Sequence, residues 1–339
     1  QMLVSKKGKI VYNKSFGYHT YKKLNKLENN HIFDLSSITK ILATMPLVIQ
    51  EYETGNLSLN TKLNELFPKR KLADKGEITL KEMLSHYARL RAWIPFYEET
   101  LDRKEKPKTR FYKTNSRSSF SIPVTENLFL KRNYKEKIFK SIVESELIEK
   151  LEFKYSDLPF YFLKFWFEDM YSKSLDILAE ERIFNKLQLE RTMFNPYKKL
   201  SLDEIVPSEE DDFFRYSKLH GYVHDEGAAM LGGVSGHAGL FSNSYEVAVI
   251  LQAMIQGGSY NSQRLFNSES FDVFNTCYYC EYDNRSGVGF DKPQIEGNHG
   301  STFGGVSMNS FGHYGYTGSM AWADPDEEII FVFLSNRTF

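Results

Sequence analysis

The sequence predicts a mixed α/β fold of the α+β type, in which an antiparallel sheet is flanked by helices and a mostly helical lobe is inserted. Strand-like runs stand near both ends of the 339-residue chain, at 2–18 and 328–334, whereas helical periodicity dominates the middle. The chain is 41% hydrophobic with 27 Phe and 21 Tyr, which suffices for a sizeable core. We therefore expect the N- and C-terminal strands to be neighbours in one sheet.

The first elements can be placed from turn and cap residues. Lys7-Gly8 is a turn signal between short apolar runs, so residues 2–18 predict a β-hairpin. Residues 37–54 show helical periodicity that ends at Gly55, a residue type favoured just after a helix. A strand followed by a long apolar helix is the expected start of the fold.

Most of the elements expected in the middle and at the end of the chain are helices. Thr79 is a predicted N-cap for a short helix that ends near residue 84. Residues 98–135 are charged and aperiodic and predict a long surface excursion. Further helices are expected at 135–151, 157–189 and 244–257. We expect a single unit over the whole chain, with the boundaries 1–49 and 191–339 for the α/β part and 50–190 for the helical insertion.

Charge and hydropathy exclude several classes of protein. Lys+Arg number 43 against 44 Asp+Glu, so no global basic field is available to bind nucleic acid. The basic run at 104–110 lies beside acidic residues at 98–105, which favours a solvated loop over a nucleic-acid patch. No apolar run reaches the length of a transmembrane helix. The chain begins within a strand-like pattern and without a recognisable leader, so we expect it to be a fragment of a longer protein.

Ser37-Ile38-Thr39-Lys40 opens the first helical stretch. A serine three residues before a lysine places both side chains one turn apart on the same helix face. A serine hydroxyl needs a neighbouring group to take its proton, and a partly desolvated lysine can do so. The N–H groups at the start of the helix also face any anion that forms there. This short motif alone is weak evidence, and its weight depends on the rest of the chain.

Two further segments strengthen the interpretation of Ser37 and Lys40 as a catalytic pair. Tyr155-Ser156-Asp157 precedes a predicted helix, and His313-Tyr314-Gly315 precedes the last strands. A Ser-x-x-Lys motif, then Tyr-x-Asn/Asp, then Lys/His-Thr-Gly resembles the serine β-lactamase and penicillin-binding-protein superfamily. Within it, the chain is similar to the branch of class C β-lactamases, D-alanyl-D-alanine carboxypeptidases and family VIII esterases. It also resembles the β-lactamase-like module found after a family 3 N-acetylglucosaminidase in some bacterial fusion proteins.

This resemblance implies a β-lactamase/transpeptidase-like fold and a catalytic set. Ser37 would be the nucleophile, and Lys40 would accept or hold its proton. Tyr155 would complete the relay, provided that its pKa falls from the usual value near 10. The oxyanion would be held by the backbone N–H groups of Ser37 and Tyr316.

The resemblance also implies substrate-binding positions and a setting. His313 would bind a substrate carboxylate, and Gly315 would leave the strand open for substrate, with Tyr314 and Asp157 beside it. The substrate would be a small molecule or peptide, with no cofactor and no metal. The parent protein would be extracytoplasmic (periplasmic or secreted), with the unit fused or docked to a glycoside hydrolase domain.

Three residues depart from the family's pattern. Tyr314 replaces a small threonine, which predicts that its phenol obstructs penicillin binding. Arg89 replaces a glycine, so a positive φ there would cost about 1 kcal/mol. Asp157 replaces the commoner asparagine and would favour charged Lys40, which shifts the role of base toward Tyr155.

Other chemistry-bearing residues have weaker interpretations. The run His-Asp-Glu at 224–226 suggests a metal site or a carboxylate pair, but adjacent residues point apart and the spacing is not that of helical zinc ligands. His237 between glycines is expected to be structural. Cys277 and Cys280 are two ordinary thiols or a local disulfide, because two ligands cannot close a zinc site.

Two functions from different classes remain at this point. The first is a serine hydrolase that forms an acyl-enzyme with a small ester, amide or D-amino-acid peptide, linked to cell-wall material. The second is a catalytically weak or silent module that binds peptides or a partner domain, which the changes at 313–315 and 88–89 motivate. The presence of Ser37, Lys40 and Tyr155 together favours the first.

Overall fold

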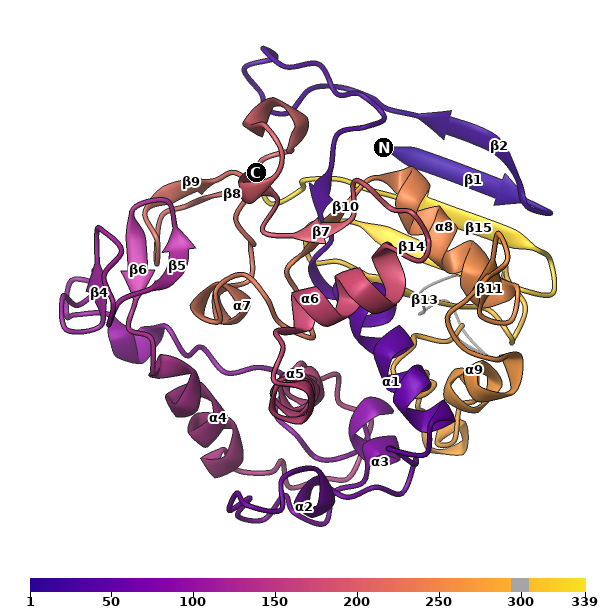
Figure 1. Ribbon diagram of the computed structural model, residues 1–339, viewed down its shortest axis with the longest axis horizontal. Coiled ribbons are helices and arrows are strands. Elements are labelled where there is room, and N and C mark those ends of the chain that lie inside the picture. Colours follow the sequence, from indigo (N-terminus) through magenta and orange to yellow (C-terminus); the bar gives the residue numbers. More distant parts are fainter. Residues whose placement is uncertain (294–304) are drawn as a thin grey trace.

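The computed structural model describes residues 1–293 and 305–339, and its main sheet is antiparallel with five strands (Figure 1). Their spatial order is β13 (Phe311–Tyr314), β14 (Met320–Asp324), β15 (Ile329–Phe333), β1 (Met2–Lys6) and β2 (Lys9–Lys14). β1 pairs with β15 from Met2↔Phe333 to Lys6↔Ile329. The predicted hairpin and the pairing of N- and C-terminal strands are therefore confirmed.

Helix α8 (Ser244–Ile255) packs on one face of this sheet, against β1, β14 and β15 (Figure 1). Alternation along the strands explains the contact, since Leu3 and Val332 are fully buried while their neighbours keep some exposure. Asn243 begins the helix, and its Oδ1 accepts the N–H of Glu246 at 2.8 Å.

The remaining helices lie mostly on the other side of α1, away from the sheet (Figure 1). The α-helices are α1 (Met45–Glu53), α2 (Leu63–Leu66), α3 (Leu80–Leu84), α4 (Tyr134–Glu144), α5 (Leu158–Tyr171), α6 (Leu175–Ala179), α7 (Glu226–Met230) and α9 (Ser268–Asn275). The 3₁₀ and π segments are η1 (Ser36–Ile38), η2 (Lys40–Thr44), η3 (Glu98–Thr100), η4 (Glu180–Phe184), η5 (Pro196–Lys198), η6 (Leu202–Glu204) and η7 (Cys280–Tyr282).

Four small sheets complete the described part of the chain. Their strands are β3 (Phe33–Asp34), β10 (Leu240–Ser242) and β7 (Met193–Phe194) in one sheet; β4 (Tyr112–Lys113), β6 (Leu128–Leu130) and β5 (Ile122–Thr125) in another; and the pairs β8 (Glu209–Asp211) with β9 (Ser217–Leu219) and β11 (Ser259–Tyr260) with β12 (Gln263–Arg264). The sheet of β3, β10 and β7 matters most, because the first of these strands leads into η1.

Two local expectations need correction. The stretch 98–135 is an excursion at the edge of the molecule, but it carries the β4–β6–β5 sheet instead of being wholly irregular (Figure 1). The helix expected from residue 37 begins as a 3₁₀ turn and a π segment before α1 continues it. Its end is as predicted, since Gly55 has φ +80°, and Thr79 caps α3 as expected.

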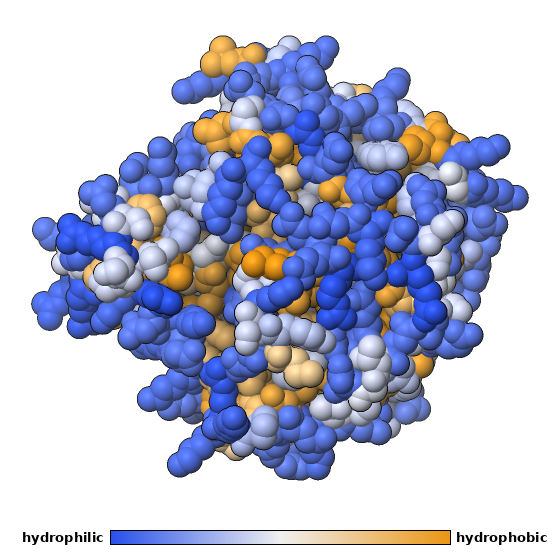
Figure 2. All heavy atoms as spheres, viewed as in Figure 1, coloured by the Kyte–Doolittle hydropathy of each residue, from blue (hydrophilic) through white to orange (hydrophobic). Residues whose placement is uncertain are grey.

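The face drawn in Figure 2 is mostly hydrophilic, with apolar side chains in small separate groups. Within the described residues, no helix combines the length and apolar character that crossing a bilayer requires.

Candidate active site

The turn that carries Ser37 is fixed by the buried carboxylate of Asp34 at the end of β3. Its Oδ1 accepts the N–H of Ser36 at 2.8 Å and its Oδ2 accepts the N–H of His224 at 2.6 Å. Burial raises the pKa of Asp34, although these two N–H donors act against the shift. Ser36 has φ +49°, a conformation that is uncommon outside glycine. The chain therefore makes an unusual turn just before Ser37.

Lys40 lies one turn after Ser37, as the spacing predicts. Its Nζ donates to Ser37 Oγ at 2.8 Å and to the carbonyl oxygen of His237 at 3.2 Å. The side chain of Lys40 is fully buried, whereas Ser37 keeps partial exposure. Asp157 Oδ1 lies 2.6 Å from Nζ, so the ammonium has a carboxylate partner. A buried charge needs such a partner, and Asp157 supplies it.

Tyr155 reaches the same serine from the segment before α5. Its hydroxyl donates to Ser37 Oγ at 3.0 Å, and its ring lies 4.8 Å from the ring of buried His86. Desolvation of the hydroxyl, and then the charge of Asp157, raise the pKa of Tyr155 well above its usual value. The expectation that this pKa falls is therefore wrong: at neutral pH, Tyr155 is a phenol that donates to Ser37.

This result also corrects the expectation for Asp157. The carboxylate pairs with Lys40, as proposed, but the same charge raises the pKa of Tyr155 instead of shifting the role of base toward it. Its oxygen serves the lysine, and its backbone N–H donates to Ala92 O at 2.8 Å. Asp157 thus lies in the site as a partner of Lys40, and a substrate contact is not needed to explain it.

The N–H of Tyr316 points to the same turn from the end of β13. It donates to Ser36 Oγ at 3.1 Å. The Tyr316 carbonyl accepts from Arg337 Nη2 at 2.6 Å, and its exposed ring stacks on that of His224 at 5.2 Å. The N–H and the carbonyl of Tyr316 therefore both have partners, and the N–H is directed toward the segment that carries Ser37.

His224 is itself held by Glu209, whose Oε2 lies 2.7 Å from His224 Nδ1. Burial disfavours the imidazolium, but the hydrogen bond and the charge of Glu209 outweigh it and raise the pKa of His224. The metal interpretation of residues 224–226 is not supported: among residues 1–293 and 305–339, no group of three or more His, Cys, Asp or Glu is arranged to hold a metal ion.

His313 and Tyr314 do not both face the site, because adjacent strand residues point to opposite faces. The His313 ring is buried and lies 5.8 Å from the Tyr155 ring, whereas the Tyr314 ring lies 6.3 Å from Trp322. The Tyr314 ring thus lies on the other face of β13 from His313, which does not favour obstruction of the cleft by its phenol, and slow penicillin acylation stays a prediction.

The expectation for His313 changes as well. Burial lowers its pKa, although Asp291 opposes the shift, so the ring is neutral at pH 7. Its Nδ1 lies 2.7 Å from Tyr314 O, which fixes the proton on Nδ1, and within the described residues its buried Nε2 has no hydrogen-bond partner. A neutral ring offers no positive charge to a substrate carboxylate.

Gly315 has a packing role that the sequence did not indicate. A Cβ at this position would lie 2.7 Å from Leu35 O and 3.4 Å from Ser36 Cβ. The missing side chain thus lets the end of β13 approach the turn before Ser37, and an open path for substrate at Gly315 stays a prediction.

The loop around Arg89 keeps its shape despite the lost glycine. Arg89 has φ +58°, so it adopts the strained conformation that we considered. Ile148 N donates to Arg89 O at 2.8 Å, and Arg89 Nε donates to Ile148 O at 2.6 Å. The same loop carries His86, also at positive φ (+55°), whose Nδ1 accepts the N–H of Ser156 at 3.2 Å. Its packing on Tyr155 has no signal in the sequence.

A second serine cluster was also missed. Ser235 Oγ lies 2.9 Å from His237 Nδ1, and His237 Nε2 lies 2.8 Å from Asp225 Oδ1. Ser235 and His237 are fully buried, and Tyr161 stacks on the imidazole at 4.3 Å. His237 is structural as expected, while the pairing of Asp225 with it removes the carboxylate-pair interpretation.

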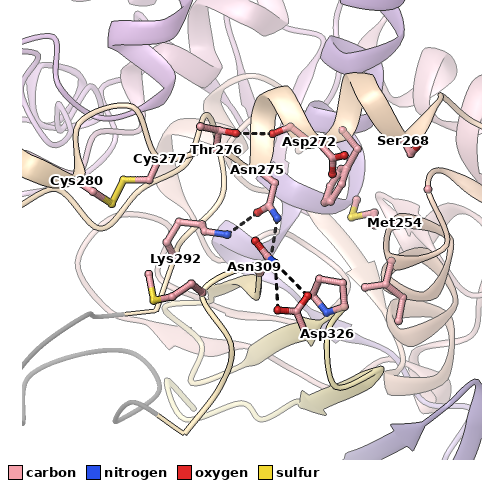
Figure 3. Close-up of a pocket in the computed structure, with 15 residues that line it drawn as sticks. Met254, Ser268, Asp272, Asn275, Thr276, Cys277, Cys280, Lys292, Asn309 and Asp326 are labelled. Carbon is pink, nitrogen blue, oxygen red and sulfur yellow. Dashed lines mark hydrogen bonds between the residues drawn. A yellow bond between two sulfur atoms is a disulfide. The ribbon is translucent and has the colours of Figure 1, made fainter.

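A separate cavity of about 550 Å³ lies between α8, α9 and the turn after β14 (Figure 3). Cys277 and Cys280, which form a disulfide, line it together with Lys292. Lys292 Nζ donates to Asn275 Oδ1 at 2.8 Å, and burial lowers the pKa of Lys292 to about 8. None of Ser37, Lys40 or Tyr155 lines this cavity, so it is distinct from the candidate active site.

The fold and the Ser-Lys-Tyr site together define a serine hydrolase of the β-lactamase class. The family described as Beta-lactamase matches residues 1–339, and the chain belongs to this family. The expected β-lactamase-like fold is therefore confirmed.

Several curated relatives carry one name. The chain is 37% identical over 198 residues to an Escherichia coli K12 protein named "Putative D-alanyl-D-alanine carboxypeptidase", an alignment that covers 54% of this chain and 44% of that relative. A Salmonella enteritidis protein of the same name is 29% identical over 370 residues, covering 99% of this chain and 78% of the relative.

Solved structures share the fold at low identity. EstCE1, described as a hydrolase with promiscuous acyltransferase activity, has a TM-score of 0.69 at 17% identity, covering 99% of this chain and 87% of its own. A penicillin-binding-protein homologue from Caulobacter crescentus has a TM-score of 0.67 at 16% identity, covering 99% and 85%.

Proposed function

We propose that this protein is a serine hydrolase that forms an acyl-enzyme on Ser37. One observation carries the proposal: a partly exposed serine accepts hydrogen bonds from both Lys40 Nζ (2.8 Å) and Tyr155 Oη (3.0 Å). Two proton-handling groups around one hydroxyl are what an activated nucleophile requires. The backbone N–H groups of Ser37 and Tyr316 would hold the oxyanion.

The proton balance assigns different tasks to the two groups. In acylation, Ser37 Oγ attacks the carbonyl carbon while its proton passes to Lys40 in the neutral amine form. Tyr155 starts as a phenol, since its pKa is raised, and it would carry a proton between Lys40 and the leaving group. Water then attacks the acyl-enzyme carbonyl and gives a proton to Lys40, which is again a neutral amine once the leaving group has been protonated. The bond from the carbonyl carbon to Ser37 Oγ breaks, and Ser37 Oγ regains its proton from Lys40. The Asp157 carboxylate lies 2.6 Å from Lys40 Nζ and competes with Ser37 for this side chain, so we expect slow turnover.

The proposed substrate is a small ester, amide or D-amino-acid peptide. The curated relatives are named as D-alanyl-D-alanine carboxypeptidases, and a neighbour in fold is an acyl-transferring hydrolase, which supports this class and a link to cell-wall peptides. An extracytoplasmic location accords with such a substrate. Fusion or docking to a glycoside hydrolase domain remains a prediction.

The silent-module alternative is not favoured. It rested on the altered residues at 313–315 and 88–89, but Tyr314 points away from the site and the loop at Arg89 keeps its conformation. Neither change removes a contact of Ser37.

Hydrolysis assays test the proposal. We expect slow release of p-nitrophenol from short-chain p-nitrophenyl esters, and release of D-alanine from a D-alanyl-D-alanine peptide, by the unmodified protein and not by Ser37→Ala. Absence of both activities in the folded, unmodified protein would favour the silent module. Activity that persists in Ser37→Ala would belong to another site.

A further inference from the structure

The hydroxyl of Ser36 is bonded to a backbone N–H that the proposed mechanism needs to be free. Its Oγ accepts the N–H of Tyr316 at 3.1 Å, the same N–H that the proposed function gives to the oxyanion. We propose that the Ser36 hydroxyl occupies this donor in the resting enzyme and has to be displaced whenever a substrate carbonyl enters. This inference rests on the proposed function and makes the Ser36 hydroxyl a competitor that lowers the acylation rate.

The Tyr316 donor cannot turn elsewhere. Its carbonyl is held by Arg337 Nη2 at 2.6 Å, and the next residue is tied to β3, since Thr317 Oγ1 donates to Asp34 O at 3.0 Å. The ring of Tyr316 has His224 against it at 5.2 Å and the Arg337 guanidinium at 5.4 Å. The peptide group that carries this N–H also carries Gly315 O, which accepts the N–H of Gly318 at 2.9 Å. The N–H therefore keeps one direction, and the competition concerns one defined position.

Ser36 is equally fixed in its backbone. It is 5% exposed, it has φ +49°, and its N–H donates to Asp34 Oδ1 at 2.8 Å. Gly315 lies against this turn, since an ideal Cβ there would be 2.7 Å from Leu35 O and 3.4 Å from Ser36 Cβ. The hydroxyl therefore leaves the Tyr316 N–H by rotation about χ1 between staggered positions, without movement of the backbone.

The usual structural reason for a serine at this place does not apply. Serine commonly begins a helix by capping a free N–H with its side chain. Here η1 begins at Ser36 itself, its cap residue is Leu35, and no side chain caps the turn. The hydrogen bond that the structure gives to the Ser36 hydroxyl is instead the one across to β13.

Displacement should have a modest and measurable cost. The oxyanion accepts a charge-assisted hydrogen bond, which is stronger than the bond to a neutral hydroxyl, so a reacting carbonyl wins the competition. A neutral hydrogen bond has a net worth that corresponds to about 2- to 12-fold in an equilibrium. Removal of the hydroxyl should therefore raise the acylation rate by about this factor.

The test compares Ser36→Ala and Ser36→Gly with the unmodified protein and with Ser335→Ala as the matched control. Ser335 also bonds a backbone atom of this segment, since its Oγ donates to Thr317 O at 3.1 Å. The readouts are kcat/KM for p-nitrophenyl acetate, the rate of fluorophosphonate labelling, and Tm. Ser36→Gly keeps the positive φ without strain and so protects against misfolding of the alanine variant.

We expect both Ser36 variants to gain about 2- to 12-fold in kcat/KM and in labelling rate, while Ser335→Ala stays within two-fold. Equal or lower rates in folded Ser36 variants would overturn the inference, because the hydroxyl would then be neutral or helpful in the reaction. Failure of the proposed function is distinguishable, since it would appear as no activity in the unmodified protein or as activity that survives Ser37→Ala.

Discussion

Among the described residues, Ser37 and Ser235 each contact a side chain that can accept or donate a proton, and their surroundings differ. Ser37 contacts Lys40 and Tyr155 at 2.8 and 3.0 Å, whereas Ser235 contacts His237 at 2.9 Å, with Asp225 behind it. By distance alone, the second set resembles a Ser-His-Asp triad. It differs in exposure: Ser235 is fully buried, while Ser37 keeps partial exposure.

The difference shows that a nucleophile is defined by its surroundings as much as by its partners. Ser37 stands at the start of a helical segment, near the N–H of Tyr316, so a substrate carbonyl finds donors there. The second cluster instead supports the first, since the His237 carbonyl accepts from Lys40 Nζ at 3.2 Å. We therefore regard Ser235, His237 and Asp225 as the scaffold that positions Lys40.

The largest expected difference in kcat/KM is between loss of the Ser37 hydroxyl and loss of the Ser235 hydroxyl. Ser37→Ala should lower kcat/KM for p-nitrophenyl esters by about 10³-fold or more, because the covalent step is lost. Ser235→Ala should change it by less than about three-fold. A large loss in a folded Ser235→Ala variant would show that the buried cluster takes part in the reaction.

The next largest difference, in kcat, is expected between substitutions of Tyr155 and Tyr161, one beside each serine cluster. Tyr155→Phe removes the donor to Ser37 Oγ and should lower kcat about 10²-fold, as for other proton-transfer groups, with little change in Tm. Tyr161→Phe, beside His237, serves as the control and should keep kcat within three-fold. Equal effects of the two substitutions on kcat would remove the distinction between the clusters.

The sequence predicted the first cluster and not the second for a physical reason. Ser37 and Lys40 are three residues apart, and helical geometry alone brings them together. Ser235, His237 and Asp225 meet only through the path of the glycine-rich segment, which no periodicity encodes. The raised pKa of Tyr155 likewise comes from tertiary burial and Asp157.

One error was avoidable from the sequence. His313 and Tyr314 are consecutive on a strand, so strand geometry already forbids both side chains from facing Ser37. The 3₁₀ and π turns of 36–44 were not predictable in this way, because the apolar pattern of a regular helix continues through them.

The scaffold role of the second cluster predicts a pH-dependent stability. Burial acts to raise the pKa of Asp225, but His237 and the helix N–H groups outweigh it and hold this pKa below its usual value. The ionised carboxylate therefore stabilises the fold above pH 4, and this contribution is lost as the pH falls through the folded-state pKa.

Asp225→Asn should thus lower the free energy of unfolding at pH 7 by about 1.5–3 kcal/mol, the value of a hydrogen bond to a charged group. Asparagine can still cap α7, which isolates the charge. Denaturant unfolding should show a smaller difference between the two proteins at pH 3 than at pH 7, because the loss begins near the unfolded-state pKa. Glu226→Gln is the matched control: burial and Asp225 raise the pKa of Glu226, so its neutralisation should not destabilise the protein at pH 7. A constant difference between Asp225→Asn and the unmodified protein would contradict the account.

The smallest effect on kcat/KM is expected from removal of the Asp157 charge beside Lys40 and Tyr155. Asp157→Asn removes a carboxylate that raises the pKa of Tyr155, so the falling limb of the pH–rate profile, where the Tyr155 phenol loses its proton, should move to lower pH. We expect kcat/KM at pH 7 to rise a few-fold. Asp169→Asn, on the exposed face of α5, is the control. A fall in rate at every pH would show that the pairing of Asp157 with Lys40 is indispensable.

The central claim is that Ser37, and not the equally well-bonded Ser235, is the nucleophile. Intact-mass analysis after fluorophosphonate treatment, followed by peptide mapping, tests it most directly, with a penicillin as a second reagent. The account predicts a single fluorophosphonate adduct on the peptide that contains Ser37, and none in Ser37→Ala. An adduct on Ser235, or an undiminished adduct in Ser37→Ala, would contradict it.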